Sequence, residues 1–246
     1  MVEQVKFIGD YHTHTVYSHG SGSVEDNVRV ALSKGLNEIA IADHGISHIS
    51  YGIKRSQIKK LRQEIDNVQK KYPDIKILMG IETNLTSLDG DIDLPYEYRD
   101  YFDIVLMGFH KAVWPKDFKS GYYLFLKNLV APIMPELSRR LRELNTLAMV
   151  RAIERHKIDI ITHPGAKINI DTRLLAQKAA ARGTLLEINA SHGYMREEYV
   201  RVAKEQGAKF IVNSDAHKPD DVGNFAKAID IVKKAGLKKE DIVNML

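Results

Sequence analysis

Short apolar runs alternate with longer amphipathic stretches along most of this chain. The apolar runs are rich in β-branched residues and predict seven strands, at Val5–Ile8, Glu38–Ala42, Ile75–Met79, Ile104–Met107, Ile158–Ile161, Leu185–Ile188 and Phe210–Val212. The stretches between them have helix-like apolar spacing and predict helices at Val24–Lys34, Arg55–Lys71, Glu136–His156, Thr172–Arg182, Glu197–Gln206 and Asp221–Ala235. Because strands that alternate with helices form parallel βαβ units, the pattern predicts an α/β fold, and seven units favour a barrel over an open sheet.

One segment, residues 111–145, interrupts this rhythm with Trp114-Pro115, Gly121-Tyr122-Tyr123 and a Pro-rich stretch at 131–135. Long excursions of this kind often form lids or binding loops, although a cap that only packs on the barrel is an equally good interpretation. The sequence shows no internal repeat and no low-complexity linker. We therefore expect residues 1–246 to form a single domain, with a lid or cap at about 111–145.

Composition narrows the class of protein. The 246 residues are 44% hydrophobic and 28% charged, which is typical of a globular domain with one core. No apolar stretch is long enough to span a membrane and no signal peptide is evident, so we expect a cytoplasmic protein. The net charge of +4 is spread over helical segments that also carry acids, which favours solvated helix faces over a nucleic-acid track, although a phosphorylated substrate would still be attracted. Because the chain has no cysteine, a transition-metal site must use histidine and carboxylate.

Possible metal ligands follow every predicted strand. In chain order they are Asp10, His12, His14 and His19; Asp43 and His44; Glu82; His110; His163; Glu187 and Asn189; and Asp215 and His217. In a barrel the C-terminal ends of the strands meet at one face, where active sites lie. Seven of the ten histidines share this position. Burying so many imidazoles together without a cation would leave their lone pairs unpartnered, so the pattern predicts a metal centre at this face.

The number of donors indicates more than one ion. The predicted ligands are His12, His14, His19, His44, Glu82, His110, His163, Asp215 and His217. Because one Zn²⁺ takes about four ligands, nine donors predict two or three divalent ions, with Glu82 as a bridge through its two oxygens. Histidine and carboxylate suit zinc, manganese or iron, and the usual chemistry of such a site is hydrolysis by a metal-bound hydroxide.

Six short motifs carry a family resemblance: D-Y-H-T-H-T (10–15), A-D-H-G (42–45), G-I-E (80–82), G-F-H (108–110), T-H-P-G (162–165) and S-D-A-H (214–217). With them the chain resembles the PHP (polymerase and histidinol phosphatase) superfamily, in its compact stand-alone bacterial phosphatase form. The resemblance implies a distorted seven-stranded (β/α) barrel, a trinuclear metal centre and phosphoesterase activity. It also implies a division of the ligands: His12, His14, Glu82 and Asp215 at one ion, Glu82, His110 and His163 at a second, and His19, His44 and His217 at a third. His19 lies in a loop-like S-H-G-S-G segment, so its place at the third ion depends on the length of that loop.

These observations predict a phosphoesterase that hydrolyses a small phosphate monoester, with Glu82, Asp43 and Asp215 as catalytic residues. Asp10 and Asp43 lie beside ligands, and we expect each to accept the second N–H of an imidazole; Asp43 could instead carry a proton or serve as an added ligand. Candidate contacts to the substrate phosphate are Lys111, Lys167, His192, Arg196 and Lys218.

Three alternatives remain open at the level of sequence. One is an amidohydrolase-type enzyme that cleaves C–N bonds, which also opens with His-x-His after a first barrel strand. Another is a nuclease or 3′-end phosphodiesterase, in which Trp114, Tyr122 and Tyr123 would stack on bases. The third is a metal-stabilised domain without enzymatic activity. The sequence contains no G-x-x-x-x-G-K-[ST], G-x-G-x-x-G, G-x-S-x-G or H-E-x-x-H motif, so nucleotide-dependent and serine-hydrolase functions lack support.

Overall fold

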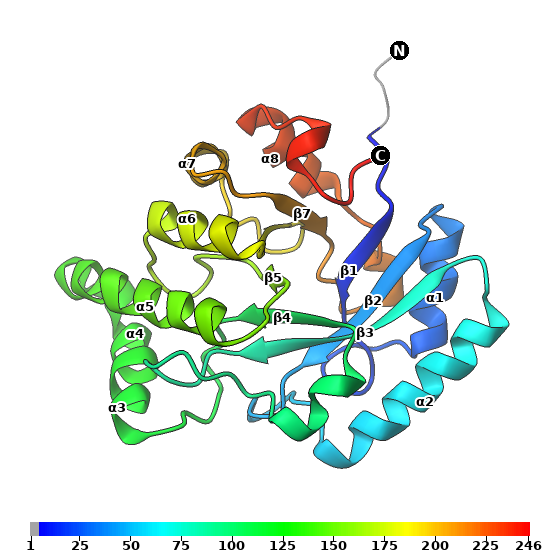
Figure 1. Cartoon of the computed structure of the whole chain (residues 1–246), viewed down its shortest axis with the longest axis horizontal. Helices are drawn as coiled ribbons and strands as arrows, with labels where there is room; N and C mark the ends of the chain where they lie inside the picture. Colours follow the sequence, from blue (N-terminus) through cyan, green and yellow to red (C-terminus); the bar gives the residue numbers. More distant parts are fainter. Residues whose placement is uncertain (1–4) are drawn as a thin grey trace.

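The computed structural model describes residues 5–246, and in this range seven parallel strands pair in chain order around a nearly closed barrel (Figure 1). They are β1 (Gly9–Thr13), β2 (Glu38–His44), β3 (Lys76–Asn84), β4 (Ile104–Gly108), β5 (Ile160–Ile161), β6 (Leu185–Asn189) and β7 (Phe210–Asn213). The chain beyond β7 returns to β1, where the His14 N–H donates to the Ala216 carbonyl at 2.8 Å. The predicted α/β barrel is confirmed.

Helices cover the outside of the barrel (Figure 1). The long ones are α1 (Val24–Ser33), α2 (Arg55–Lys71), α5 (Pro135–Arg155), α6 (Thr172–Arg182), α7 (Glu197–Glu205) and α8 (Ala226–Ala235). Local sequence sets their ends: Ser23 and Asp26 form a capping box at the start of α1, and Gly183 ends α6 in the left-handed conformation. The prediction that the last helix begins at Asp221 is wrong, because Gly223 has a φ of +69° and interrupts the chain before α8.

The first strand lies later than predicted. The apolar run Val5–Ile8 predicts the strand, but the hydrogen-bonded strand is Gly9–Thr13 and contains Asp10 and His12 themselves. In the same way, β2 continues to His44 and β3 to Asn84. The physical reason is that the C-terminal half of the barrel interior is polar, so the strands continue beyond the point where their apolar residues end.

The barrel interior has two layers. At the N-terminal side an apolar plug of Ala42, Leu106, Ile160 and Ile211 is packed against Tyr11. Side chains two residues apart in a strand point the same way, and the positions two residues beyond Ala42, Ile160 and Ile211 are the polar residues His44, Thr162 and Asn213. A β-bulge in β1 between Asp10 and Thr13 shifts its register against β2, and bulges of this kind re-aim side chains next to active sites. The larger apolar core lies between the barrel and the helices.

Residues 111–145 form ordered helical turns. α3 (Phe118–Ser120), a π-helical turn at Gly121–Leu126, α4 (Lys127–Val130) and a 3-10 turn at Ala131–Ile133 lead into α5. Asn128 and Asn145 exchange side-chain hydrogen bonds of 2.8 and 2.9 Å, which fasten α4 to α5. The segment presents Trp114, Phe118 and Ile133 to solvent. Its role as lid or cap stays a prediction.

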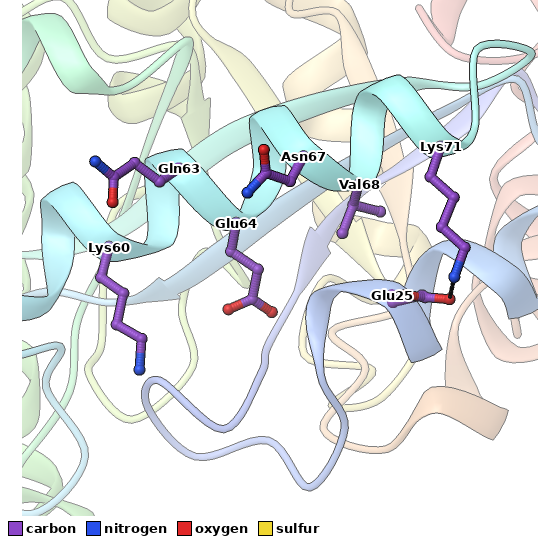
Figure 2. A pocket seen from close by; sticks show the side chains of 7 residues that line it. All are labelled: Glu25, Lys60, Gln63, Glu64, Asn67, Val68 and Lys71. Carbon is purple, nitrogen blue, oxygen red and sulfur yellow. Dashed lines mark hydrogen bonds and ion pairs between the residues drawn. The ribbon is translucent and has the colours of Figure 1, made fainter.

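A groove of about 370 Å³ runs between α1 and α2 on the outer surface (Figure 2). Its charged side chains largely satisfy one another or their neighbours: Lys71 pairs with Glu25, and Glu64 accepts a hydrogen bond of 2.6 Å from the Tyr17 hydroxyl. This groove therefore serves helix packing and has no unbalanced charge to attract a ligand. Within residues 5–246, no helix combines the length and apolar character needed to cross a membrane.

Candidate metal centre

Two buried carboxylates form the middle of a cluster of imidazoles at the C-terminal end of the barrel. Glu82, on β3, has its Oε1 within 2.9 Å of His163 Nε2 and 3.5 Å of both His12 Nε2 and His110 Nε2. Its Oε2 lies 2.7 Å from His44 Nδ1. The sequence placed these residues after five different strands, and the barrel brings them around one carboxylate.

Asp215, which follows β7, forms the second gathering point. Its Oδ1 lies 3.2 Å from His14 Nε2, 3.6 Å from His12 Nε2 and 3.6 Å from His217 Nδ1. The His12 and His14 Nε2 atoms are 3.2 Å apart, which joins the two clusters.

These separations fit divalent metal ions. Two atoms bound to one tetrahedral Zn²⁺ at about 2.0–2.1 Å lie roughly 3.3 Å apart. The donors of His12, His14, Glu82 and Asp215 have neighbouring separations close to this value. Three sets of donor atoms lie within 4.8 Å of one another: His14, His44 and His217; His12, His14 and Asp215; and His44, Glu82 and His110.

Unpartnered polar atoms point to the same conclusion. Six buried side-chain nitrogen or oxygen atoms in residues 5–246 lack a hydrogen-bond partner, and four of them belong to His14, His44, Glu82 and His163. Two of these four, His44 Nδ1 and Glu82 Oε2, lie 2.7 Å apart but form no hydrogen bond, whereas Nδ1 of His14 and Nδ1 of His163 have no partner at all among the described residues. A buried polar group without a partner costs free energy, so a native cluster of them indicates a ligand. The donor set therefore fits metal ions.

Charges within the cluster suit cation binding. Burial acts to raise the pKa values of Glu82 and Asp215, but the surrounding imidazoles outweigh it and hold both pKa values well below their usual range. Burial and neighbouring imidazoles or cations keep the pKa values of His14 and His110 well below the ordinary value, so both are neutral near pH 7. Burial acts to lower the pKa of His12, but Glu187, Asp215 and Glu82 outweigh it and raise this pKa well above the ordinary value, so an ion bound at His12 would displace a proton. Ionised carboxylates and neutral imidazoles are the forms that bind metals.

The backbone is strained around this centre. Among residues 5–246, three residues other than glycine have positive φ: His163 at 32°, Lys167 at 70° and Asp215 at 56°. Two are donors of the cluster, and the third lies beside it. Such conformations are uncommon for residues with side chains and persist where the surrounding structure holds them, often at functional sites.

The groups that orient the imidazoles differ from those expected. Glu187, on β6, holds His12, with its Oε1 2.7 Å from His12 Nδ1, and Asn84 Oδ1 lies 2.7 Å from His110 Nδ1. Asn84 is itself fixed by the buried carboxylate of Asp93, which accepts its side-chain N–H at 2.6 Å. The sequence indicates Glu187 only as a possible metal ligand and assigns no role to Asn84 or Asp93, although Asn84 shares a strand face with Glu82.

Asp10 and Asp43 do not accept hydrogen bonds from imidazole, contrary to expectation. Asp10 accepts from the Ser214 hydroxyl and from the Gly223 N–H at 2.9 Å, and so joins β1 to the loop after β7. Asp43 accepts from the Thr15 hydroxyl at 2.6 Å and from the Ser18 hydroxyl. Asp43 therefore secures the loop that leads to His19.

His19 lies at the rim of the cluster and belongs to none of the three donor sets. It is exposed and stacks on Tyr51 with ring centroids 3.8 Å apart, while its ring is 4.8 Å from that of His217. His48, which the sequence did not single out, stacks on His44 at 5.1 Å. Together these rings form one wall of a cavity of about 280 Å³ above the carboxylates.

The predicted substrate contacts divide into two groups. Lys167 and His192 line the 280 Å³ cavity, and His192 Nε2 lies 3.3 Å from Asp215 Oδ2. Burial lowers the pKa of Lys167, although Glu82 and Asp215 act in the opposite direction. Lys111 lines an adjoining cavity, which is described below. Arg196 and Lys218 are exposed beside short turns and do not line the metal cavity, and neither do the aromatic residues considered for base stacking, Trp114, Tyr122 and Tyr123.

Comparison with known proteins agrees with this geometry. The family described as PHP domain matches residues 10–214, and the family described as PHP-associated matches residues 196–244. A protein named "Probable phosphatase" from Shewanella sp. (strain MR-4) is 32% identical, covering 96% of this chain and 86% of that protein. Another of the same name from Thermoanaerobacter sp. (strain X514) is 31% identical, covering 98% and 91%.

A solved structure shares the fold. The histidinol phosphate phosphatase from Lactococcus lactis, complexed with zinc, L-histidinol and phosphate, superposes with a TM-score of 0.63 at 17% identity and covers 95% of each chain. The family match spans every donor of the cluster up to β7, and the named relatives extend over nearly the whole chain. The chain therefore belongs to the PHP family and is a metal-dependent phosphatase.

Proposed function

We propose that the protein hydrolyses a small phosphate monoester at a trinuclear metal site. The observation that carries this proposal is the overlap of the three donor sets, which share His14 and His44 and meet at Glu82 and Asp215. Eight buried or half-buried donors around two carboxylates exceed what one ion can use. Zinc, manganese and iron all suit such donors.

The proposed division of ligands is the one that the family resemblance implies, and the grouping of His12, His14 and Asp215 and of His44 and His217 supports it. His12, His14, Glu82 and Asp215 would hold a first ion, and Glu82, His110 and His163 a second. His44 and His217 would hold the third, with His19 completing it from the rim, where its ring lies 4.8 Å from that of His217. Divalent ions at these positions supply an activated water and neutralise charge on the phosphoryl oxygens.

Side chains of the protein would bind the substrate phosphate and orient the metal ligands. The Lys167 ammonium and the His192 ring border the 280 Å³ cavity and would bind phosphoryl oxygens that face away from the ions. Glu187 and Asn84 orient the His12 and His110 rings, so that Nε2 of each faces Glu82. Asp43 would act by holding the loop of His19, because its oxygens already accept hydrogen bonds from Thr15 and Ser18. The small cavity favours a compact monoester over a polynucleotide.

We also propose that residues 1–246 act as one domain with residues 111–145 as its cap. The segment matched as PHP-associated contains β7, which pairs with β6 inside the barrel. Near the C-terminus, Val243 N–H donates to the Phe210 carbonyl at 2.8 Å. These contacts support a single folding unit.

The test is hydrolysis of p-nitrophenyl phosphate by protein loaded with Mn²⁺ or Zn²⁺. Glu82→Gln should lose bound metal and turnover together, because an amide offers one acceptor oxygen where the carboxylate offers two. Glu64→Gln is the matched control, since Glu64 lies on α2 and makes the same charge change with one hydrogen bond to Tyr17. Full turnover in Glu82→Gln would overturn the proposed site.

A substrate panel separates the competing activities. The proposal predicts faster hydrolysis of p-nitrophenyl phosphate than of bis(p-nitrophenyl) phosphate, single-stranded DNA or p-nitroacetanilide. Preference for the diester or for DNA would support a nuclease instead, and preference for the anilide would support cleavage of C–N bonds.

A further inference from the structure

A second cavity adjoins the metal cavity. It has a volume of about 380 Å³, and its lining includes Lys111, Asn128, Asn169 and Tyr194. Lys167 lines both cavities, so the two are neighbours that share one ammonium group. The second cavity is bordered on one side by loops that follow barrel strands and on the other by the cap segment, which contributes Asn128.

The charge of this second cavity is unbalanced. Two lysines line it, and no aspartate or glutamate does. In the part of the chain that the structure describes, neither Lys111 nor Lys167 forms an ion pair within 4.0 Å. Lys167 is half-buried and Lys111 is exposed, so the free-energy cost of a cation without a partner falls mainly on Lys167, and an anionic ligand would offset it.

Another cavity on the surface provides a comparison. About 520 Å³ lie between α5, α6 and α7, and three arginines line this space. Each has a carboxylate partner: Arg139 pairs with Glu136, Arg142 with Asp171, and Arg173 with Glu205. The arginines of this cavity are thus each paired with a carboxylate, whereas, within residues 5–246, the two lysines beside the metal centre are not.

The backbone positions of the two lysines are set by the segments that carry the metal donors. Lys111 directly follows His110, and Lys167 lies four residues beyond His163 with a left-handed backbone. Asn128 is fixed by hydrogen bonds of its side-chain amide to the Leu124 carbonyl and to Asn145. The cavity is thus built from elements that position the metal donors, with one wall from the cap.

We infer that this cavity binds a second anionic group of the substrate, so that the substrate class is a compact phosphate monoester whose organic part carries a carboxylate or a second phosphate. The inference rests on the proposed function, because the first phosphate would occupy the metal cavity. Two ammonium groups would repel a leaving group that carries an amine. Histidinol phosphate, whose organic part is cationic at neutral pH, would therefore be a poor substrate.

Matched substrates test this inference with the metal-loaded protein. The first pair is 3-phosphoglycerate against glycerol 3-phosphate, which differ by a carboxylate, and the second is propane-1,3-diol bisphosphate against its monophosphate. We expect kcat/KM to be about tenfold higher or more for the anionic member of at least one pair, mainly through KM, since an interaction made with a remote part of the substrate acts on binding. Histidinol phosphate should fall below both members of that pair.

Lysine variants locate the effect. Lys111→Met should reduce the preference for the anionic member to near unity. Lys119→Met is the control, because Lys119 lies in the same cap segment, is exposed and lines neither cavity. It removes the same charge and should preserve the preference. A ratio near one in the unsubstituted protein, or an equal loss in both variants, would overturn the inference.

The outcome is distinguishable from failure of the proposed function. If no phosphate ester is hydrolysed, including p-nitrophenyl phosphate, the proposed function fails. The inference is then decided by binding, measured calorimetrically with propane-1,3-bisphosphonate and propylphosphonate on the metal-loaded protein. Tighter binding of the bisphosphonate that Lys111→Met abolishes would sustain it, and equal affinities would overturn it.

Discussion

Substitution of Glu187 by glutamine probes how the protein prepares its metal donors. The carboxylate accepts four hydrogen bonds: its Oε1 from His12 Nδ1 at 2.7 Å and Asn213 Nδ2 at 2.9 Å, and its Oε2 from the His163 N–H at 2.7 Å and Asn189 Nδ2 at 2.9 Å. Burial acts to raise the pKa of Glu187, but His12 outweighs it and the pKa ends below its ordinary value. Glu187 is therefore ionised, and both of its carboxylate oxygens accept hydrogen bonds.

Glutamine has the same shape but one acceptor oxygen. The backbone N–H of His163 can only donate a hydrogen bond, so we expect the amide oxygen to face His163 and the amide nitrogen to face His12. Burial acts to lower the pKa of His12, and the Glu187 carboxylate helps to raise it. Without that carboxylate, the neutral ring can adapt by accepting at Nδ1 and carrying its proton on Nε2, the atom that faces Glu82 and His14. That tautomer cannot bind a metal ion through Nε2. Asn213 loses its acceptor, because its own oxygen is already used by the Tyr11 N–H at 3.0 Å.

The expected magnitudes follow from these two losses. Removing a group that orients a metal-binding histidine weakens metal affinity about 10- to 100-fold, or about 1.4 to 2.8 kcal/mol. The unpartnered Asn213 amide should lower the unfolding free energy of the metal-free protein by about 1 to 3 kcal/mol. Competition with a chromophoric chelator measures the first quantity, and urea unfolding measures the second.

Glu64→Gln again serves as the control and should change neither quantity by a comparable amount. If Glu187→Gln folds and keeps its metal affinity within about twofold of the parent protein, the tautomer argument is wrong, because tenfold is the smallest loss it allows.

Three further predictions concern the centre and the stability of the fold. A methyl group at Gly108 would lie 3.1 Å from Glu82 Oε1 and 2.5 Å from Thr162 Oγ1, so Gly108→Ala should displace the Glu82 carboxylate. We expect phosphatase kcat to fall about tenfold or more, while the unfolding free energy measured in urea falls by only about 1 to 3 kcal/mol. An unchanged kcat would contradict this prediction. Removing metal with EDTA should lower Tm, and Mn²⁺ at about 100 times its Kd should restore about 2.7 kcal/mol, whereas a Tm indifferent to both would count against the site. Burial acts to raise the pKa of Asp91, but Lys116 at 2.8 Å and other donors lower it below its ordinary value. The ionised Asp91 carboxylate therefore contributes to the unfolding free energy at pH values above its pKa in the unfolded state, and this contribution is lost as the pH falls through its pKa in the folded state. Asp91→Asn should therefore be less stable than the parent at pH 7, with a difference that shrinks toward pH 3; a difference that grows on acidification would reverse this sign.

The barrel was predictable because apolar runs alternate with amphipathic stretches along the chain, and this alternation predicts βαβ units. The start of β1 was not predictable from the sequence, because Asp10 and His12 are polar residues that are typical of loops. They belong to a strand here because the barrel interior becomes polar toward its C-terminal end. The same rule explains why β3 continues to Asn84. The polar residues that bind metal interrupt the apolar pattern, so the pattern does not predict where a strand beside a metal centre ends.

The gathering of donors was predictable in kind, because each donor follows a strand and strands of a barrel share one end. Which carboxylate meets which imidazole was not. Glu187 and His12 are separated by 175 positions, and only the closed barrel brings them to 2.7 Å. The neighbours in sequence, Asp10 and Asp43, were assigned that role because proximity along the chain was the available signal, and their oxygens face hydroxyl and backbone groups instead.

The most direct test of the central claim is to count and locate the metal ions in the purified protein. Elemental analysis by inductively coupled plasma mass spectrometry, combined with anomalous scattering from a crystal, gives both the number of ions per chain and their ligands. We expect two or three divalent ions per chain, with Glu82 and Asp215 each bound to at least one of them. One ion or none after loading with Zn²⁺ or Mn²⁺, or ions bound away from these two carboxylates, would contradict it.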